Sequence, residues 1–290
     1  PTLFTSFASG QSSVLFANSS LADGNYRAYV RVAAANATDL WSDWDYEAFT
    51  VDAPNPGVPT LTVTGENSNG RVKLEVDDTS GGTGTNYFHV QRSDDGGTTF
   101  VDVRTTLGSG FIATSGPKVT LYDYEAPNGS TVSYRARAFN STYSTYSDWQ
   151  SGSGGWSSAS WWLKHNSKPS LNLELGIVRS VPGFEVAANQ TVHKVLGSSR
   201  VVVVSDTAGP VTGSIVVLTE DTAERQALMN TLDLQVPMLL QAPVSSDEPE
   251  RWVVFGDRSS TPLADKSWVH ANDEVLPWTE VDRPSGALEE

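Results

Sequence analysis

The sequence contains no cysteine, which excludes a disulfide framework and any metal site built on thiolates. Long apolar runs are also missing: the longest, around Val201–Val204 and Val236–Leu240, fall far short of the roughly 18 residues that a membrane-spanning helix needs. Basic residues are few, because 19 Lys and Arg stand against 34 Asp and Glu, giving a net charge of −15. This charge repels phosphate backbones and anionic lipid, so we expect no nucleic-acid partner and no membrane insertion.

Turn-forming residues, by contrast, are plentiful. The 290 residues include 24 Gly and 15 Pro, with abundant Ser, Thr and Asn, whereas hydrophobic residues make up only 38%. Such a composition is typical of many short strands joined by turns. At about 100 to 200 residues per domain, the length predicts two or three domains. We therefore expect an all-β protein with more than one domain.

An internal repeat supports this division. Tyr26-Arg27-Ala28 recurs as Tyr134-Arg135-Ala136, and Trp41-Ser42-Asp43-Trp44 recurs as Tyr146-Ser147-Asp148-Trp149. The two copies lie just over 100 residues apart. This spacing matches the usual size of a β-sandwich domain, about 100 residues. We interpret the repeat as two sandwich domains of the same kind.

The second copy, in residues 54–167, has the pattern of a complete Greek-key sandwich. Seven alternating runs are separated by Gly, Asn and Asp clusters. The predicted strands are Thr60–Thr64, Val72–Val76, Tyr87–Arg92, Phe100–Arg104, Lys118–Tyr122, Val132–Phe139 and Ser157–Lys164. With Tyr134–Asn140 followed by Ser147-Asp148-Trp149, this region resembles the fibronectin type III domain.

The first copy, in residues 1–53, contains only the late strands of such a domain. Three runs predict strands, at Ser13–Phe16, Tyr26–Val32 and Tyr46–Val51. Either this chain is a fragment of a longer protein that contains the missing strands, or those strands come from elsewhere. We favour the fragment, because the chain does not begin with Met. Prolines in residues 52–59 predict a stiff linker to the second copy.

The last segment, residues 168–284, differs in character and carries most of the net negative charge. Asp221 followed by Glu224 predicts a helix start, and Ala227, Leu228 and Leu232 then fall on one helix face. We expect a β-sandwich with this one helix, followed by a C-terminal tail at 285–290. The predicted strands are Leu171–Val178, Arg200–Ser205, Gly213–Leu218, Met238–Gln241, Arg251–Phe255 and Val275–Val281.

Residues 170–284 contain a series of short motifs, which are, in order, Val195-Leu196-Gly197, Val201–Asp206, Gly213–Thr219, Ala223-Glu224-Arg225, Pro237–Pro243, Arg251–Asp257 and Trp278–Pro284. This series is similar to minor tail proteins of long-tailed bacteriophages and, more loosely, to the hub domain of distal tail proteins. The resemblance implies a tail-tube-like sandwich that packs into a ring or hub at the tail tip of a virion. Its implied partners are further copies of itself, in a symmetric oligomer, and other tail proteins. In distal tail proteins the hub domain usually lies at the start of the chain, whereas here the similar segment lies at the end. The resemblance therefore leaves open which tail component this is.

No set of residues predicts catalysis, a cofactor or a metal. The four histidines, His89, His165, His193 and His270, are scattered without ligand spacing, and neither a phosphate loop nor a Gly-x-Ser-x-Gly turn occurs. Residues 93–100 resemble an Asp-box, but a single Asp-Gly-Gly turn between two β runs predicts a hairpin. Asp77-Asp78 and residues 247–250 predict solvated acidic loops, with a divalent cation as an alternative at the second. We therefore expect a protein that is not an enzyme.

Nine tryptophans are unusual for this length. Those of the repeated motif, Trp41, Trp44 and Trp149, predict core positions or stacking on arginine. Trp156, Trp161 and Trp162 flank the start of the last segment and are candidates for an interface, with sugar stacking as the alternative. Alternation along a strand places Trp161 and Trp162 on opposite faces.

Together these features predict a structural component of a phage tail tip that assembles through residues 168–284 and displays its fibronectin-like part. One alternative is a carbohydrate-binding adhesion module that contacts a glycan on the host surface. Another is an accessory region of a secreted bacterial hydrolase.

Overall fold

The computed structural model describes most of the chain from residue 21 onwards. The described residues are 21, 24–31, 41–51, 55–78, 84–114 and 116–289, apart from 182, 187, 189, 195, 198, 200, 206–208, 234 and 264–270. Over these residues the protein is mostly β-strands in several antiparallel sheets with a single α-helix, so the predicted all-β fold is confirmed. The strand predicted at Ser13–Phe16 lies outside the described residues.

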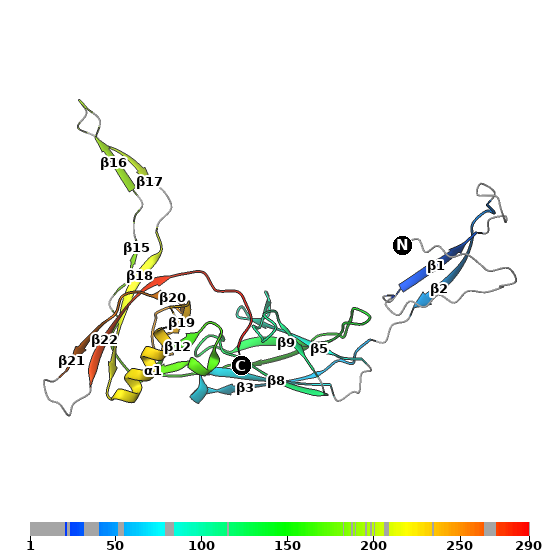
Figure 1. Ribbon diagram of the computed structural model, residues 1–290, viewed down its shortest axis with the longest axis horizontal. Coiled ribbons are helices and arrows are strands. Elements are labelled where there is room, and N and C mark those ends of the chain that lie inside the picture. The colour runs from blue at the N-terminus through cyan, green and yellow to red at the C-terminus, as the bar shows by residue number, and fades with distance from the viewer. Residues whose placement is uncertain are drawn as a thin grey trace.

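Two strands near the N-terminus form a hairpin of their own. β1 (Gly24–Val30) pairs with β2 (Asp45–Val51), as the repeat predicts. Figure 1 shows this hairpin, in blue, at the far end of the molecule from the helix. Its sheet has no third strand among the described residues.

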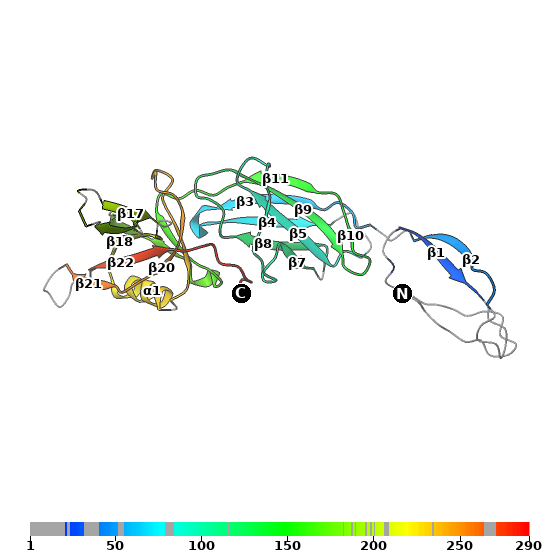
Figure 2. The same ribbon diagram turned by 90° about the horizontal axis from the view of Figure 1, so that it is seen from above.

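The middle of the chain folds into a sandwich of two sheets, which we call the first sandwich (Figure 2). One sheet has the order β3 (Thr60–Glu66), β4 (Arg71–Asp77), β8 (Lys118–Asp123). The other is centred on β5 and β9 and consists of β5 (Tyr87–Ser93), β6 (Val101–Asp102), β7 (Phe111–Ala113), β9 (Val132–Asn140), β10 (Thr145–Tyr146) and β11 (Gln150–Gly154). Alternate residues of both sheets, such as Leu74, Phe88 and Ala136, are buried between them and form one core.

The prediction of a seventh strand at Ser157–Lys164 is wrong. The last strand of the first sandwich is β11, which pairs with β9, whereas β12 (Trp161–His165) belongs to the sheet of the following domain. β11 lacks an apolar pattern because it lies against β3: a Cβ on Gly154 would come within 2.6 Å of Val63 Cγ1. Strand pairing therefore places the domain border before Trp161 rather than at residue 167.

The C-terminal domain is built on one nine-stranded sheet. Its strands are β13 (Leu173–Leu175), β12, β19 (Met238–Gln241), β20 (Arg251–Phe255), β22 (Asn272–Glu280), β18 (Val211–Thr219) and β14 (Ile177–Ser180), with β15 (Glu185–Val186) and β21 (Ser259–Pro262) beside them. Residues from six of these strands and from the helix share one core. The order of strands is non-sequential, so segments far apart in the chain become neighbours.

The helix α1 (Thr222–Leu232) confirms the sequence prediction. Asp221 Oδ1 accepts a hydrogen bond of 2.8 Å from the Glu224 backbone N–H, which caps the first turn. Leu228 and Leu232 are buried in the domain core, and Ala227 is half-buried beside them.

A separate two-stranded ribbon projects from this domain. β16 (Gln190–Lys194) pairs with β17 (Val201–Ser205) and with no strand of the nine-stranded sheet. Figure 1 shows the ribbon standing clear of the body, beyond β15 and β18. We call residues 190–205 the arm.

The C-terminal tail returns to the first sandwich. The Leu288 backbone N–H donates to Thr105 O at 3.0 Å, and Arg104 Nε donates to Gly286 O at 3.2 Å. The tail therefore adds a second connection between the two domains besides the chain itself.

Candidate functional site

The tryptophans at the start of the C-terminal domain lie at its contact with the first sandwich. Trp156 and Trp162 are only 2% and 4% exposed, and their rings meet edge to face with centroids 6.0 Å apart. Trp156 Nε1 donates to Ala126 O at 2.8 Å. Trp161, on the opposite side of β12, packs into the other core, as alternation predicts. Because Trp156 and Trp162 are buried inside the chain, neither ring is open to a sugar.

Lys164 crosses from the C-terminal domain into the first sandwich at the same place. Its ammonium lies 4.1 Å from the centroid of the Trp156 ring and donates to Tyr124 O at 2.7 Å and to Gly70 O. Gly70 has a φ of 59°, and a Cβ there would lie 2.8 Å from the Trp162 ring, so only glycine fits. Burial lowers the pKa of Lys164 to about 7.

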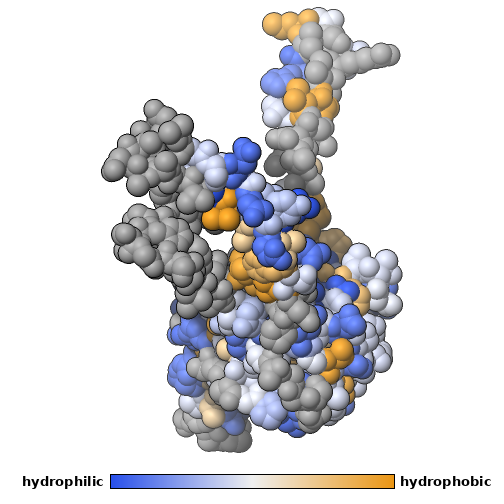
Figure 3. Space-filling view, turned by 90° about the vertical axis from the view of Figure 1, so that its right-hand side faces the viewer, coloured by the Kyte–Doolittle hydropathy of each residue, from blue (hydrophilic) through white to orange (hydrophobic). Residues whose placement is uncertain are grey.

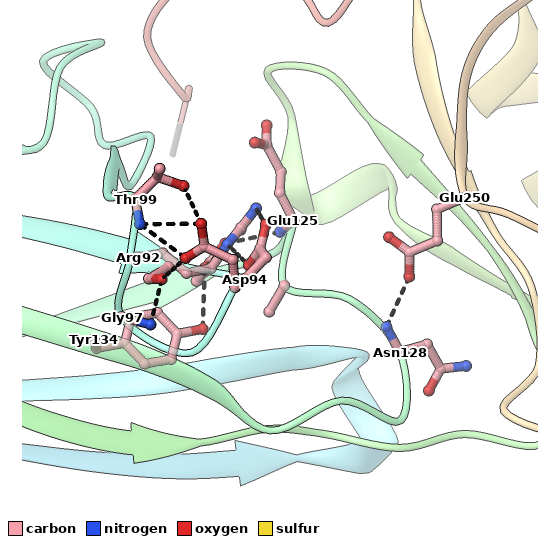
Figure 4. A network of polar contacts seen from close by, with 12 residues as sticks. Arg92, Asp94, Gly97, Thr99, Glu125, Asn128, Tyr134 and Glu250 are labelled. Carbon is pink, nitrogen blue, oxygen red and sulfur yellow. Dashed lines mark hydrogen bonds and ion pairs between the residues drawn. The ribbon is translucent and has the colours of Figure 1, made fainter.

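Asn128 forms the other half of this junction (Figure 4). Its side chain donates to Ala242 O at 2.8 Å and to Ser158 O at 3.0 Å, and its backbone N–H donates to Glu250 Oε1 at 2.7 Å. Burial raises the pKa of Glu250. Residues 247–250 are therefore not simply a solvated loop as predicted, because the chain turns Glu250 inward to accept this bond while Asp247 and Glu248 remain exposed.

We predict a pH signature for this junction. The folded chain gives up the Lys164 proton near pH 7, whereas an exposed lysine keeps it to about pH 10.5, so the free energy of unfolding should rise as the pH is raised from 7 to 9. In Lys164→Met this rise should shrink, because the buried amine is gone. Urea denaturation of both proteins at several pH values from 7 to 9 measures the free energy of unfolding. An equal rise with pH in the two proteins would contradict the prediction.

A buried ion pair lies at the same end of the first sandwich, where β5, β8 and β9 meet (Figure 4). Arg92 Nη1 donates to both oxygens of Asp123, at 3.0 and 2.9 Å, and Tyr134 Oη donates to Asp123 Oδ2 at 3.1 Å. Burial acts to raise the pKa of Asp123, but the charge and hydrogen bonds of Arg92 outweigh it and hold the pKa below its usual range. The pair is satisfied within the protein, so we interpret it as structural.

The Asp-box-like turn is also satisfied internally. Asp95 accepts hydrogen bonds from Ser93 Oγ at 2.6 Å and from the backbone N–H of Thr98 and Thr99 at 3.0 and 2.8 Å. These bonds hold the pKa of Asp95 well below its usual range. The turn joins β5 to β6 in antiparallel pairing, so the predicted hairpin is confirmed.

The structure does not bring the histidines together. His89 bonds to Asp102, His165 Nδ1 accepts from the backbone of Ser167, and His193 is exposed on the arm. His270 lies outside the described residues. Within the part of the chain that the structure describes, no group of three or more His, Asp or Glu is placed to hold a metal ion.

The acidic pair Asp77-Asp78 was expected in a solvated loop, and this prediction is wrong. Asp77 ends β4 and is half-buried, and Asp78 is buried, accepting a hydrogen bond of 2.7 Å from Thr85 Oγ1. β4 runs one residue beyond its last apolar residue, to Asp77, and the Asp78 backbone N–H then donates to Pro117 O at 2.7 Å, which holds the pair against the sandwich.

The repeated tryptophans do stack on arginine, as predicted. In the first sandwich, Trp149 lies between Arg135 and Arg137, each 4.3 Å from the ring centroid. Phe100 lies 3.9 Å from Arg135, and Tyr146 lies 3.8 Å from Arg137. We call these five residues the ladder. Sequence reasoning identified the tryptophan but not the two arginines, whose signal is their spacing of two along β9.

Over the described residues, the three most exposed large apolar side chains of the C-terminal domain, Leu196, Val192 and Val204, lie on the arm. Leu196 at its tip is fully exposed, and Val192, Val203 and Val204 are each about half exposed. Figure 3 shows hydrophobic residues on this projection, away from the body. In sequence, residues 190–205 include Lys194 and Arg200 and no acid, although the protein as a whole is strongly acidic.

Comparison with known proteins gives no identity. No protein-family model matches the sequence, and no curated protein sequence matches it significantly. In the described residues, no helix has the length and apolar character to cross a membrane.

Proposed function

We propose that the protein is a structural component of a bacteriophage tail tip, that it assembles through its C-terminal domain, and that it displays fibronectin-like sandwiches. The observation that supports this proposal most is the arm, a projecting ribbon with exposed apolar side chains and a local positive charge on an acidic protein. Apolar patches of this kind mark contacts with other protein surfaces. We propose further copies of the chain and other tail proteins as the partners.

The junction supports the same role. Buried tryptophans, Lys164 and Asn128 join the two domains into a stiff unit. This suits a structural component that holds its neighbours in fixed positions rather than a protein whose domains open and close. The polar clusters described above are satisfied by their own neighbours. We propose on this basis that the chain has no hydrolytic activity.

Arm substitutions should weaken self-association. Burying one Leu or Val side chain contributes about 1.5 to 3 kcal/mol, so Leu196→Asp combined with Val204→Asp should raise the dissociation constant by more than about tenfold. Sedimentation velocity over a concentration series measures the dissociation constant of self-association. Because the net charge opposes association, higher salt should leave the association of the unaltered chain unchanged or tighten it.

Leu107→Asp is the matched control, because Leu107 is half exposed on the first sandwich and the substitution adds the same kind of charge. It should assemble like the unaltered chain. If the double arm variant also assembles normally, or if the unaltered chain stays monomeric at every concentration, assembly through the arm is rejected.

Adhesion to a host-surface glycan is the second candidate, and the ladder is the observation that favours it. Its arginines lie on a sheet face of the displayed sandwich and have no carboxylate partner. Stacked guanidinium groups already occupy the Trp149 ring, so an acidic sugar is favoured over a neutral one.

A further inference from the structure

The arginines of this protein fall into two groups. Over the described residues, most form an ion pair with a carboxylate, and these are Arg71, Arg92, Arg104, Arg179, Arg225, Arg251, Arg258 and Arg283. The others are Arg27, Arg31, Arg135 and Arg137, and every one of them stacks on an aromatic ring. In a protein with a net charge of −15, acids to pair with them are abundant. The absence of a carboxylate partner at these four arginines therefore needs a reason.

The stacking fixes how the two guanidinium groups of the ladder are presented. Arg135 and Arg137 are two residues apart on β9 and point to the same face of the sheet. Both lie 4.3 Å from the centroid of Trp149, so the two charges are at most twice that distance apart. A guanidinium that stacks on a ring keeps its N–H groups at the edge of the stack, where they can donate in pairs to an oxyanion.

The neighbours of these arginines are neutral. Arg135 donates through Nε and Nη2 to the amide oxygen of Gln91, at 2.8 and 2.6 Å. Arg137 Nη2 lies 3.3 Å from His89 Nδ1. Burial lowers the pKa of His89, and its Nε2 lies 2.8 Å from Asp102 Oδ1, so neutral His89 donates to Asp102 and accepts from Arg137.

The ladder is thus a pair of cations that makes no direct ion pair among the described residues, although the charge of Asp102 acts on Arg137. Asp102 itself is engaged by His89 and by Gln91 Nε2, which donates to it at 2.9 Å. The Nη1 groups of Arg135 and Arg137 have no acceptor among the described residues, and both side chains are half-buried rather than free in solvent. Burial lowers the pKa of Arg137, and the like charge of Arg135 adds to this effect. Oxyanions at the edge of the stack, one beside each guanidinium group, would relieve both costs.

We infer that Arg135 and Arg137 form a binding site for the oxyanions of an acidic polysaccharide. The hairpin of β1 and β2 carries a second pair of stacked arginines, which are exposed and use separate rings: Arg27 lies 4.9 Å from the Tyr46 ring centroid and Arg31 lies 4.3 Å from that of Trp41. Two such sites on one chain suit a polymer that repeats its charge, because a second contact on the same polymer adds avidity. The site is separate from the arm, so it stands or falls independently of self-association.

Isothermal titration of the full chain with polygalacturonate tests this site, with dextran as the neutral polymer. The unaltered chain should bind polygalacturonate and not dextran, and binding should weaken as NaCl is raised over the range in which the screening length falls to about 10 Å. Arg135→Gln combined with Arg137→Gln should lower the affinity at least tenfold. Polyphosphate, used as a second probe, distinguishes phosphate from carboxylate: binding of either polymer that depends on both arginines supports the site.

The control is Arg179→Gln combined with Arg258→Gln, which removes the same charge from two ion-paired surface arginines. It should bind within about twofold of the unaltered chain, because neither arginine belongs to the ladder. Its net charge equals that of the ladder variant, so the comparison separates the site from the overall charge. Arg135→Lys combined with Arg137→Lys keeps the charge and should bind several-fold more weakly than arginine, since lysine donates as a point charge. Equal losses in the ladder and control variants, unimpaired lysine binding, or no binding of either anion by the unaltered chain would overturn the inference.

Discussion

The Leu228→Asp variant should fail to fold its C-terminal domain. Leu228 is 1% exposed and lies in a core with strands from both ends of the nine-stranded sheet. Truncating such a leucine costs about 2 to 5 kcal/mol, and burying a carboxylate in its place costs more. A domain of this size is stable by only about 5 to 15 kcal/mol, so the substitution removes most or all of that. Circular dichroism and limited proteolysis of the full chain measure the loss.

Gln226→Asp is the comparison for this variant, because it places the same side chain on the exposed face of the same helix. It should change the free energy of unfolding by less than about 1 kcal/mol. The first sandwich keeps all of its core except Trp162, so in Leu228→Asp it should resist protease better than the C-terminal domain does. A cooperative unfolding transition of unaltered size in Leu228→Asp would show that α1 does not pack as described.

The helix and most strands follow from local patterns, which is why the sequence predicts them. Asp221 and Glu224 act within one turn, and the alternation in Val132–Phe139 needs only the two faces of one strand. β11 was missed because its glycines are selected by the closeness of β3, which no local pattern encodes. The predicted domain border at residue 167 differs from the strand pairing for a related reason. β12 has the alternation of a strand, but alternation does not indicate which sheet the strand joins.

The candidate sites depend even more on distant parts of the chain. Trp162 belongs to the core of the first sandwich although its strand belongs to the other domain, and Glu250 is turned inward by Asn128, more than a hundred residues earlier. The ladder was half predicted, because the repeat marks Trp149 while the neutral surroundings of Arg135 and Arg137 exist only after folding. Residue type and spacing predict which groups can interact, and the fold decides which of them lack a partner.

Arg92→Met should be the most destabilising change in the first sandwich. It leaves the Asp123 carboxylate, which is 3% exposed, buried without its cation, and breaking a buried pair from one side costs about 3 to 5 kcal/mol. In the unaltered chain the pKa of Asp123 is lowered, so the pair stabilises the fold above the ordinary aspartate pKa and this contribution is lost on acidification. Guanidinium denaturation at pH 7, compared with the unaltered chain, measures the cost.

The pH dependence separates this mechanism from a simple packing defect. Without Arg92, burial dominates and should raise the pKa of Asp123 above its unfolded value, so acidification protonates the folded variant first. The stability difference between variant and unaltered chain should therefore narrow as the pH falls from 7 towards 4, and adding Asp123→Asn to Arg92→Met should abolish this narrowing. Asp94→Asn removes only the exposed partner of Arg92 and should cost less than about 1 kcal/mol. A difference that stays constant with pH would mean that the damage lies in packing and that Asp123 does not hold a buried charge.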